Sequence, residues 1–168
     1  INTMNANLNE FAQPTRYSWL TAFAGKYMND WLTISASALA TIINEDVKEG
    51  GSAGNHRKLT PYISASFKPF YHEEFRIRFF YKDIFRLPSF NDLYYQEVGN
   101  TKLRPENARQ YNVGLTYSKN VCPFLPYLSA TIDAYYNKVT DKIIAYPTKN
   151  LAVWSMRNLG EVEIKGID

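Results

Sequence analysis

The feature that most constrains this chain is a period-two alternation of apolar and polar side chains, sustained over long stretches. The clearest stretch is 31–43. One face of it carries the apolar residues Leu32, Ile34, Ala36, Ala38, Ala40 and Ile42. The other face carries Thr33, Ser35, Ser37 and Thr41, with Leu39 as the exception. A strand separates two such sets, whereas a helix would scatter both around its circumference.

The same alternation recurs along the chain and predicts an all-β fold. The expected strands, about seven, are 15–27, 31–43, 59–68, 75–86, 108–118, 127–138 and 157–167. Most have about the 9–11 residues that a tilted membrane-spanning strand requires. A typical soluble strand has only about 5–6 residues.

The links between these strands add a second signal. They alternate strictly between short ones (28–30, 69–74, 119–126) and long ones (44–58, 87–107, 139–156). In an antiparallel up-and-down meander, this alternation places all the short links at one end of the sheet. Outer-membrane barrels have that asymmetry, with short periplasmic turns and long external loops. The sequence therefore predicts a section of a large transmembrane β-barrel.

Composition agrees with strands that cross a membrane. The chain has a mean hydropathy of -0.37 and no run of the roughly 18 apolar residues that a membrane helix needs. Aromatic residues make up 15% of it, and they gather near the ends of the expected strands, as interfacial rings do. Those near the long links are Tyr17, Trp19, Tyr81, Phe85, Tyr111 and Tyr136. The same rings would also suit the core of a soluble β-sandwich.

Charge and reactive residues exclude several classes of function. The net charge of +3 is spread over mixed acids and bases, so no nucleic-acid partner is expected. Cys122 is alone, and His56 and His72 lie in separate links, so we expect neither a metal site nor a cofactor. No nucleophile lies beside a base, and we expect no enzyme. The polar face of the strands would carry the charges Arg76, Arg78, Lys82, Asp133, Glu161, Glu163 and Lys165.

Four segments resemble signatures of TonB-dependent receptors, and their order and spacing match over about residues 60 to 168. Phe85-Arg86-Leu87-Pro88-Ser89-Phe90-Asn91-Asp92-Leu93-Tyr94 resembles "FRAPxxxELY". Gly99-Asn100-Thr101-Lys102-Leu103-Arg104-Pro105-Glu106, followed by Gly114, resembles "GNPxLKPExxxxxExG". Tyr135 to Ile144 is similar to "YYNxxxDxI", and Asn158 to Asp168 to "NxGxxxxxGxE". Leu87, Asp92, Thr101, Asn112 and Asp168 depart from these patterns but keep the polarity or shape in most cases.

The first two motifs, residues 85–106, form the candidate site, and we interpret them as loop architecture rather than ligand contacts. Pro88 breaks the strand, and Gly99-Asn100 is a turn pair that tolerates positive φ. Pro105 favours an extended approach into the next strand. Arg86 is expected to pair with Asp92 or Glu106 and so to fix the loop. The remaining candidate positions are Phe85, Leu93, Tyr94 and Leu103.

The resemblance implies an outer-membrane active transporter. Members are plugged barrels of roughly 22 strands that import a scarce large nutrient, such as a ferric siderophore, haem or cobalamin, with energy relayed by TonB. Residues 1–168 would be a partial barrel domain, without the plug that contacts the TonB complex and without the final strands. A passive porin and a soluble β-sandwich that binds carbohydrate are the alternatives. In the whole receptor this segment would lie in outer-membrane lipid. As an isolated segment it would curl or associate with a second copy, and so cover its apolar face.

Overall fold

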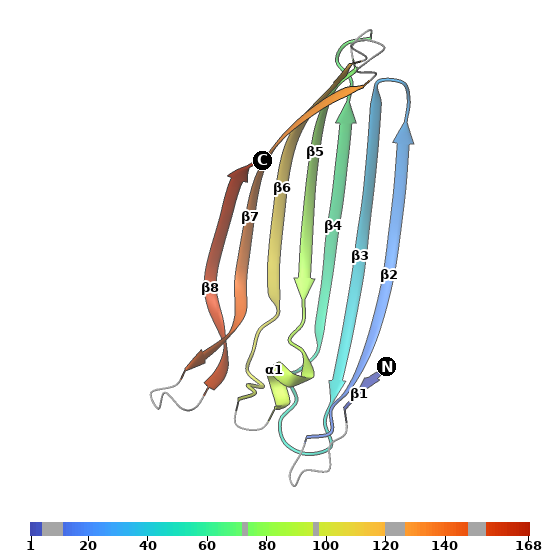
Figure 1. Ribbon diagram of the computed structural model, residues 1–168. Coiled ribbons are helices and arrows are strands. Elements are labelled where there is room, and N and C mark those ends of the chain that lie inside the picture. Colours follow the sequence, from blue (N-terminus) through green and yellow to red (C-terminus); the bar gives the residue numbers. More distant parts are fainter. Residues whose placement is uncertain (5–11, 72–73, 96–97, 120–126, 148–153) are drawn as a thin grey trace.

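The computed structural model describes residues 1–4, 12–71, 74–95, 98–119, 127–147 and 154–168. They form one eight-stranded antiparallel sheet whose strands follow the chain order from β1 to β8, which is an up-and-down meander (Figure 1). The strands are β1 Asn2–Thr3, β2 Thr15–Met28, β3 Leu32–Asp46, β4 His56–Phe67, β5 Glu74–Arg86, β6 Glu106–Lys119, β7 Leu128–Pro147 and β8 Trp154–Ile167. One short helix, α1 Phe90–Tyr94, lies between β5 and β6. No described helix has the length and apolar character needed to cross a membrane.

The seven long strands predicted from the sequence are present, and β1 is an addition of 2 residues. The long link expected at 139–156 is wrong, because strands occupy much of it. β7 continues to Pro147, and its pairing with β8 extends up to Pro147 opposite Trp154. β-branched residues such as Val139 and Ile143 keep this part of β7 extended. Asp141, at φ 56, is the only described interruption.

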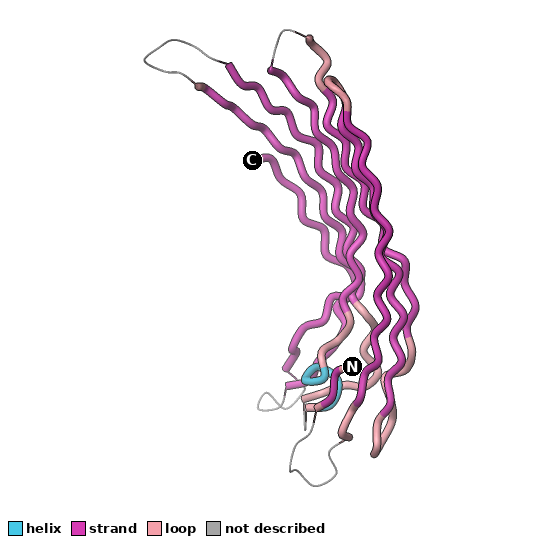
Figure 2. The backbone as a smooth tube through the Cα atoms, turned by 90° about the vertical axis from the view of Figure 1, so that its right-hand side faces the viewer, coloured by secondary structure: helices cyan, strands magenta, loops and turns pink. Residues whose placement is uncertain are grey.

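The links separate to the two ends of the sheet as predicted. The connections from β2 to β3 and from β4 to β5 lie at one end, and those from β3 to β4 and from β5 to β6 lie at the other. Figure 2 shows the sheet from the side as a curved wall, with α1 at the end of the long links. Asn29 closes the first short turn, where its Oδ1 accepts from the backbone N–H of Leu32 at 2.8 Å.

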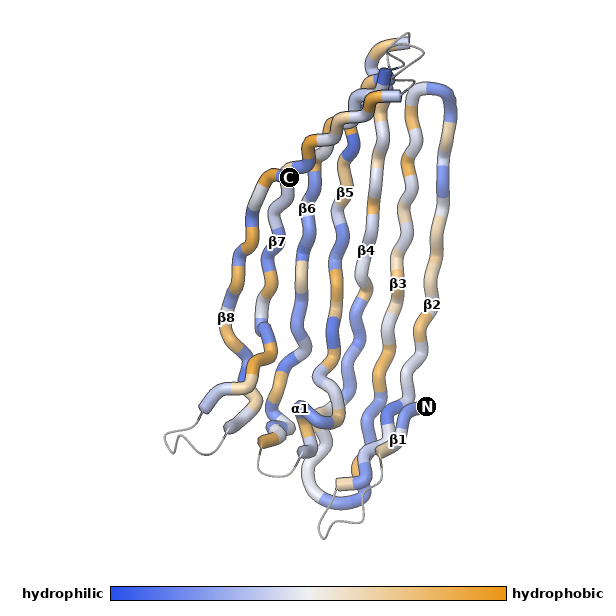
Figure 3. Tube along the Cα trace, viewed as in Figure 1, coloured by the Kyte–Doolittle hydropathy of each residue, from blue (hydrophilic) through white to orange (hydrophobic). Residues whose placement is uncertain are grey.

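The register fixes which side chains share a face. Ile34 pairs with Ala65, Ala65 with Phe79, and Phe79 with Val113, so the apolar sets of four strands lie on one face. We call this the outer face, and Figure 3 shows how apolar and polar residues alternate along the strands. Large apolar side chains are exposed on it, including Phe23 at 70%. The opposite, inner face carries the polar sets.

The register corrects one sequence-based assignment. Arg78 and Asp133 lie on the inner face as expected, with Gly114 between them. Lys165, however, pairs with Tyr136, which pairs with Tyr111 on the outer face. Glu161, Glu163 and Lys165 therefore lie on the outer face. The sequence of β8 alone does not show which face its charged residues occupy, because hydrogen bonding to β7 fixes the register.

The described core lies at the end with the long links. Phe90, Leu93, Tyr94, Leu103 and Ile143 are buried together there, and Leu93 is only 2% exposed. Elsewhere the sheet is a single layer with both faces uncovered. β8 pairs only with β7 in the described residues, so the expectation that the sheet curls to cover its apolar face is wrong for this chain. Association with a second copy stays a prediction.

Candidate functional site: the loop platform

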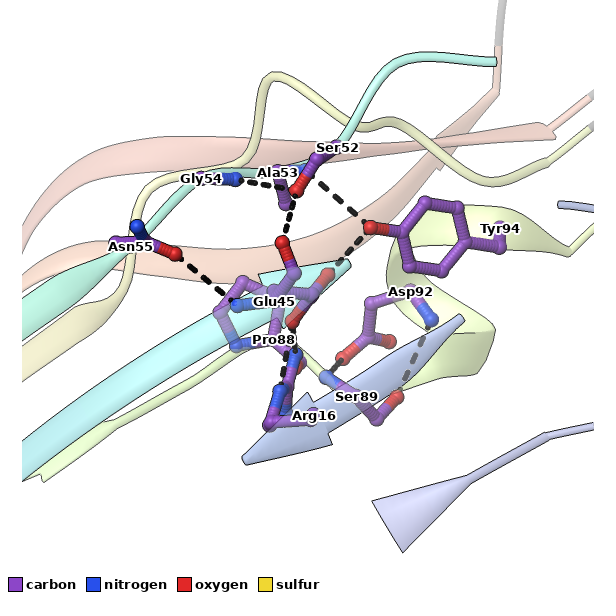
Figure 4. Close-up of polar contacts among 10 residues, drawn as sticks. All are labelled: Arg16, Glu45, Ser52, Ala53, Gly54, Asn55, Pro88, Ser89, Asp92 and Tyr94. Carbon is purple, nitrogen blue, oxygen red and sulfur yellow. Dashed lines mark hydrogen bonds and ion pairs between the residues drawn. The ribbon is translucent and has the colours of Figure 1, made fainter. Parts of the chain in front are cut away.

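Glu45, near the end of β3, is the centre of a buried polar cluster (Figure 4). Its carboxylate accepts from Nε of Arg16 at 2.7 Å and from the hydroxyl of Tyr94. Arg16 is the register partner of Glu45 on β2, whereas Tyr94 comes from α1. The side chain of Glu45 is 2% exposed. A buried carboxylate needs such partners, because an uncompensated one would be costly.

The cluster also holds the backbone of two loops. Arg16 donates to the carbonyl of Pro88 at 3.1 Å, and its guanidinium lies 4.7 Å from the ring centre of Phe90. Ser52 donates to the backbone carbonyl of Glu45 at 2.9 Å. The hydroxyl of Tyr94 accepts from the N–H of Ala53 at 3.2 Å. One ion pair therefore joins the strand ends to both described long links.

Burial shifts two titrating groups near Glu45. The pKa of Tyr94 is raised to about 12, first by desolvation and then by its hydrogen bond to Glu45. The pKa of His56, at the start of β4, is lowered by desolvation, which Glu45 opposes and Arg16 reinforces. Burial therefore favours the neutral form of both side chains.

Helix α1 is fixed at its start by a capping box. Ser89 Oγ accepts from the N–H of Asp92 at 3.2 Å, and the carboxylate of Asp92 accepts from the N–H of Ser89 at 2.9 Å. These reciprocal bonds satisfy backbone donors that have no partner within the helix. The box orients α1 so that Leu93 and Tyr94 point into the core.

Arg86 pairs as the sequence predicts. Its guanidinium lies 3.0 Å from Glu106 Oε1 and 3.9 Å from Asp92 Oδ2. Glu106 is the register partner of Arg86 on β6, and it also accepts from the N–H of Ile143 on β7 at 2.6 Å. Glu106 thus joins β5, β6 and β7 where the strands meet the loops.

Gly99 is required for a close approach and not for a positive φ, so the sequence-based reason for it is wrong. Neither Gly99 nor Asn100 is among the described residues with positive φ. A Cβ on Gly99 would lie 2.7 Å from the carbonyl oxygens of Leu93 and Tyr95. Its N–H donates to the carbonyl of Tyr95 at 2.7 Å. Only glycine lets the loop return this closely against the end of α1.

Asn100 and Asn158 connect the loop to α1 and to the β7–β8 hairpin. The backbone N–H of Asn100 donates to the carbonyl of Asp92 at 2.8 Å, and its side chain donates to the carbonyl of Met156 at 3.0 Å. Asn158 Nδ2 donates to the carbonyls of Arg104 at 2.8 Å and Asp141 at 2.7 Å. The two amides therefore fix the loop against strands that follow it in the chain.

The structure brings all four signature segments together in one network, which we call the loop platform (residues 85–106 with the ends of β2, β3, β7 and β8 that contact them). Phe85 and Pro105 lie at its margins, while Pro88, Leu93 and Leu103 are buried in it. The sequence did not reveal Arg16 and Glu45, which no motif contains. Their only signal was a pair of opposite charges near the ends of expected strands.

The chemistry of the loop platform is that of a rigid scaffold. The carboxylates of Glu45, Asp92 and Glu106 each accept from a cation or a backbone N–H group. Among the described residues, no three His, Cys, Asp or Glu side chains lie together as a metal site needs. Cys122 and His72 lie outside the described residues.

Seven strands of 12 to 20 residues, an apolar outer face and a loop platform at one end define a section of an outer-membrane β-barrel. The sequence pattern of the family described as TonB dependent receptor-like, beta-barrel matches residues 15–168, and the chain belongs to this family. Its members are transporters of the bacterial outer membrane and not enzymes.

Relatives of this chain are much longer. It is 34% identical over 84 residues to the vitamin B12 transporter BtuB of Vibrio vulnificus, a match that covers 50% of this chain and 13% of that protein. The BtuB transporter of Photobacterium profundum is 32% identical over 88 residues, with the same coverage. The FrpB iron transporter of Neisseria meningitidis (F5-1 variant, apoprotein form) is similar in structure, with a TM-score of 0.64 and 13% identity over 94% of this chain and 23% of its own length.

Proposed function

We propose that this chain is a wall section of an outer-membrane active transporter, which binds a scarce large nutrient outside the cell and imports it with energy relayed by TonB. The observation that carries the proposal is the family match over residues 15–168, together with the signature residues gathered in the loop platform. In this proposal the loop platform lies outside the cell, and the links 29–31 and 68–73 lie in the periplasm.

The complete receptor would hold a plug domain inside its barrel, and the TonB complex would contact the plug from the periplasmic side. The candidate site residues, from Phe85 to Glu106, would act by holding the strand ends and external loops in a fixed arrangement. Their contacts support this role, because Glu106, Asp92 and Tyr94 are each engaged by other protein groups. Rigid strand ends give a large ligand fixed loop bases to bind between.

The nutrient that we propose to test first is a cobalamin. Two relatives matched in sequence are vitamin B12 transporters, at 34% and 32% identity. The iron transporter is similar at 13% identity, so that likeness concerns the fold alone. Ferric siderophores and haem are the second class to test.

The experiment measures nutrient uptake by cells from which the gene for the complete receptor has been deleted. We expect deletion to abolish uptake of radiolabelled cyanocobalamin, and a plasmid copy to restore it only where TonB is present. Labelled ferric siderophore and haem are measured in parallel. Restoration without TonB would indicate a passive porin, and unchanged uptake of all three nutrients would contradict the proposal.

A further inference from the structure

The ladder between β4 and β5 stops before either strand ends. Its last pair on the side of the loop platform is Tyr62 opposite Lys82. From there to the loop platform, residues 56–61 of β4 pair with β3 but not with β5, and residues 83–86 of β5 pair with β6 but not with β4. We call this unpaired stretch the open seam. Both strands remain extended along it, so the wall of the barrel is divided here into two parts.

Pro61 gives a physical reason for the place where the ladder stops. Continuing the register by one residue would put Pro61 opposite Asp83. Proline has no backbone N–H to donate, and in sheets it is confined to edge strands, strand starts and bulges. Oδ1 of Asp83 is buried without a hydrogen-bond partner, and a cavity of about 230 Å³ lies here, with Thr60, Tyr62, Lys82 and Asp83 among its lining residues. The two strands are therefore loosely joined along the open seam.

The open seam begins where the lipid-facing part of the wall ends. Tyr81, Tyr111 and Tyr136 form a row on the outer face, with ring centres 5.0 Å and 6.1 Å apart. Such tyrosine rows lie at the level of lipid headgroups. Tyr81 still pairs with Ile63, so the β4–β5 ladder is closed up to this level. Unpaired strand edges are not tolerated in the hydrocarbon region, but beyond the headgroups water can hydrate them, so an opening is possible on this side alone.

Side chains of the Glu45 cluster join the two sides of the open seam (Figure 4). Arg16 and Glu45 belong to β2 and β3, on the side of β4. Arg16 donates across the seam to the carbonyl of Pro88 at 3.1 Å and lies 4.7 Å from the ring centre of Phe90. Glu45 accepts from the hydroxyl of Tyr94. Pro88, Phe90 and Tyr94 all follow β5 in the chain, so these contacts, which we call the latch, replace the missing ladder.

The open seam also lies between two of the long links. The connection from β3 leads into β4 on one side of it, and the connection to β6 leaves β5 on the other side. His56 and Phe85 meet across the seam through their rings, whose centres are 6.4 Å apart. Such a ring contact depends on side chains, as the latch does, and it lacks the repeated backbone hydrogen bonds that make a ladder stiff. The state of the latch therefore determines how far apart the two links can move.

We propose that the latch controls an opening of the barrel wall at the open seam. With the latch closed, side chains hold β4 and β5 together between Pro61 and the loop platform. With the latch released, the part of the wall made of β2–β4 separates from the part made of β5–β8, and the closed ladder from Tyr62 to Phe67 acts as the hinge. In the proposed function this end is the entrance for the nutrient, so the separation widens the entrance. The separation itself is measured without a nutrient, so failure of the proposed function is recognised separately.

The test is a distance measurement between two spin labels, by pulsed electron paramagnetic resonance, on the complete receptor in lipid vesicles and in a Cys122→Ser background. The first pair of label sites, Thr21→Cys/Arg109→Cys, lies on β2 and β6 and spans the open seam. The second pair, Tyr27→Cys/Val113→Cys, lies on the same two strands and spans the closed ladder. All four side chains are exposed, and each pair is separated by four strand spacings, or about 19 Å.

The latch is broken by Arg16→Met and, more conservatively, by Tyr94→Phe. In both variants we expect the distance across the open seam to lengthen by about 5 Å, or one strand spacing, while the distance across the closed ladder keeps its wild-type value. Arg78→Met is the control, because it removes a cation of β5 whose partner Asp133 lies on the same side of the seam, and it should change neither distance. An unchanged distance across the seam in the latch variants would overturn the inference. Equal lengthening of both distances, or the same lengthening in the control, would overturn it as well.

Discussion

Arg78 on β5 and Asp133 on β7 form an ion pair of 2.9 Å that passes across the intervening strand β6. The residue between them in the register is Gly114. A Cβ there would lie 2.2 Å from Oδ1 of Asp133 and 2.8 Å from Nη2 of Arg78. The absence of a side chain at Gly114 therefore permits a contact between two strands that are not neighbours. This gives a physical reason for glycine in the second signature.

Replacing Gly114 with Val is expected to lower the free energy of unfolding by about 1–3 kcal/mol, because the new side chain overlaps the ion pair. Val favours strands, so any loss cannot come from strand propensity. The measurement is urea-dependent folding of the complete receptor into lipid vesicles. Gly160→Val is the control, since nothing lies within 4 Å of the Cβ position at Gly160. Equal effects of the two changes would show that the ion pair is not what Gly114 protects.

Replacing Tyr94 with Phe is expected to loosen the loop platform. The change leaves Glu45 buried with one partner fewer, which costs about 1–3 kcal/mol. Hydrogen–deuterium exchange should increase in residues 44–58 and 88–95 of the receptor. Tyr95→Phe is the matched control, because Tyr95 is exposed and its hydroxyl has no described partner. If both variants exchange alike, the Tyr94–Glu45 contact does not hold these loops.

The assignment of the outer face to lipid is tested on neighbouring residues of β3. Ala38 lies on the outer face, opposite Phe23 and Pro61, whereas Ser37 lies on the inner face. Ala38→Arg is expected to cost roughly 2–4 kcal/mol near the bilayer midplane and to impair assembly. Ser37→Arg should be tolerated, because it would face water in the lumen. Assembly is measured by heat-modifiable migration of the receptor in gels. If Ser37→Arg impaired assembly more than Ala38→Arg, the inner face and not the outer face would contact lipid.

The orientation of the sheet predicts which cysteines react with an impermeant thiol reagent on whole cells. In a background with Cys122→Ser, Glu49→Cys in the link 47–55 should be labelled. Asp30→Cys in the link 29–31 should react only after the cells are opened. Both side chains are exposed, so accessibility of the residue itself does not differ. The opposite pattern would put the loop platform in the periplasm.

Residues 1–168 alone are expected to associate in water. Apolar side chains such as Phe23 (70% exposed), Ile132 (58%) and Val113 (50%) form a broad uncovered face. An exposed apolar surface of this kind drives association, and the open edge of β8 adds unpaired backbone groups. Static light scattering without detergent should give a mass well above that of one chain. A stable monomer would contradict the membrane assignment of the outer face.

The sequence was sufficient for features that repeat over short distances. Alternation along single strands predicted the seven long strands, the apolar set of β3 and the meander. The ion pair of Arg86 with Glu106 was also predictable, because the first signature carries Arg86 and the second carries Glu106. The extra length of β7 was missed because the pairing that extends it depends on β8, which lies further along the chain.

Only the tertiary structure decided the relationships that depend on register and on distant packing. The outward position of Lys165 follows from its pairing with Tyr136, and local charge on β8 pointed the other way. Arg16 and Glu45 become a buried centre only when α1 folds back over the strand ends and brings Tyr94 to them. Gly99 and Gly114 each accommodate atoms from other parts of the chain. Periodicity is a property of neighbouring residues and can be determined from the sequence, whereas register and burial arise from contacts between segments far apart in the chain.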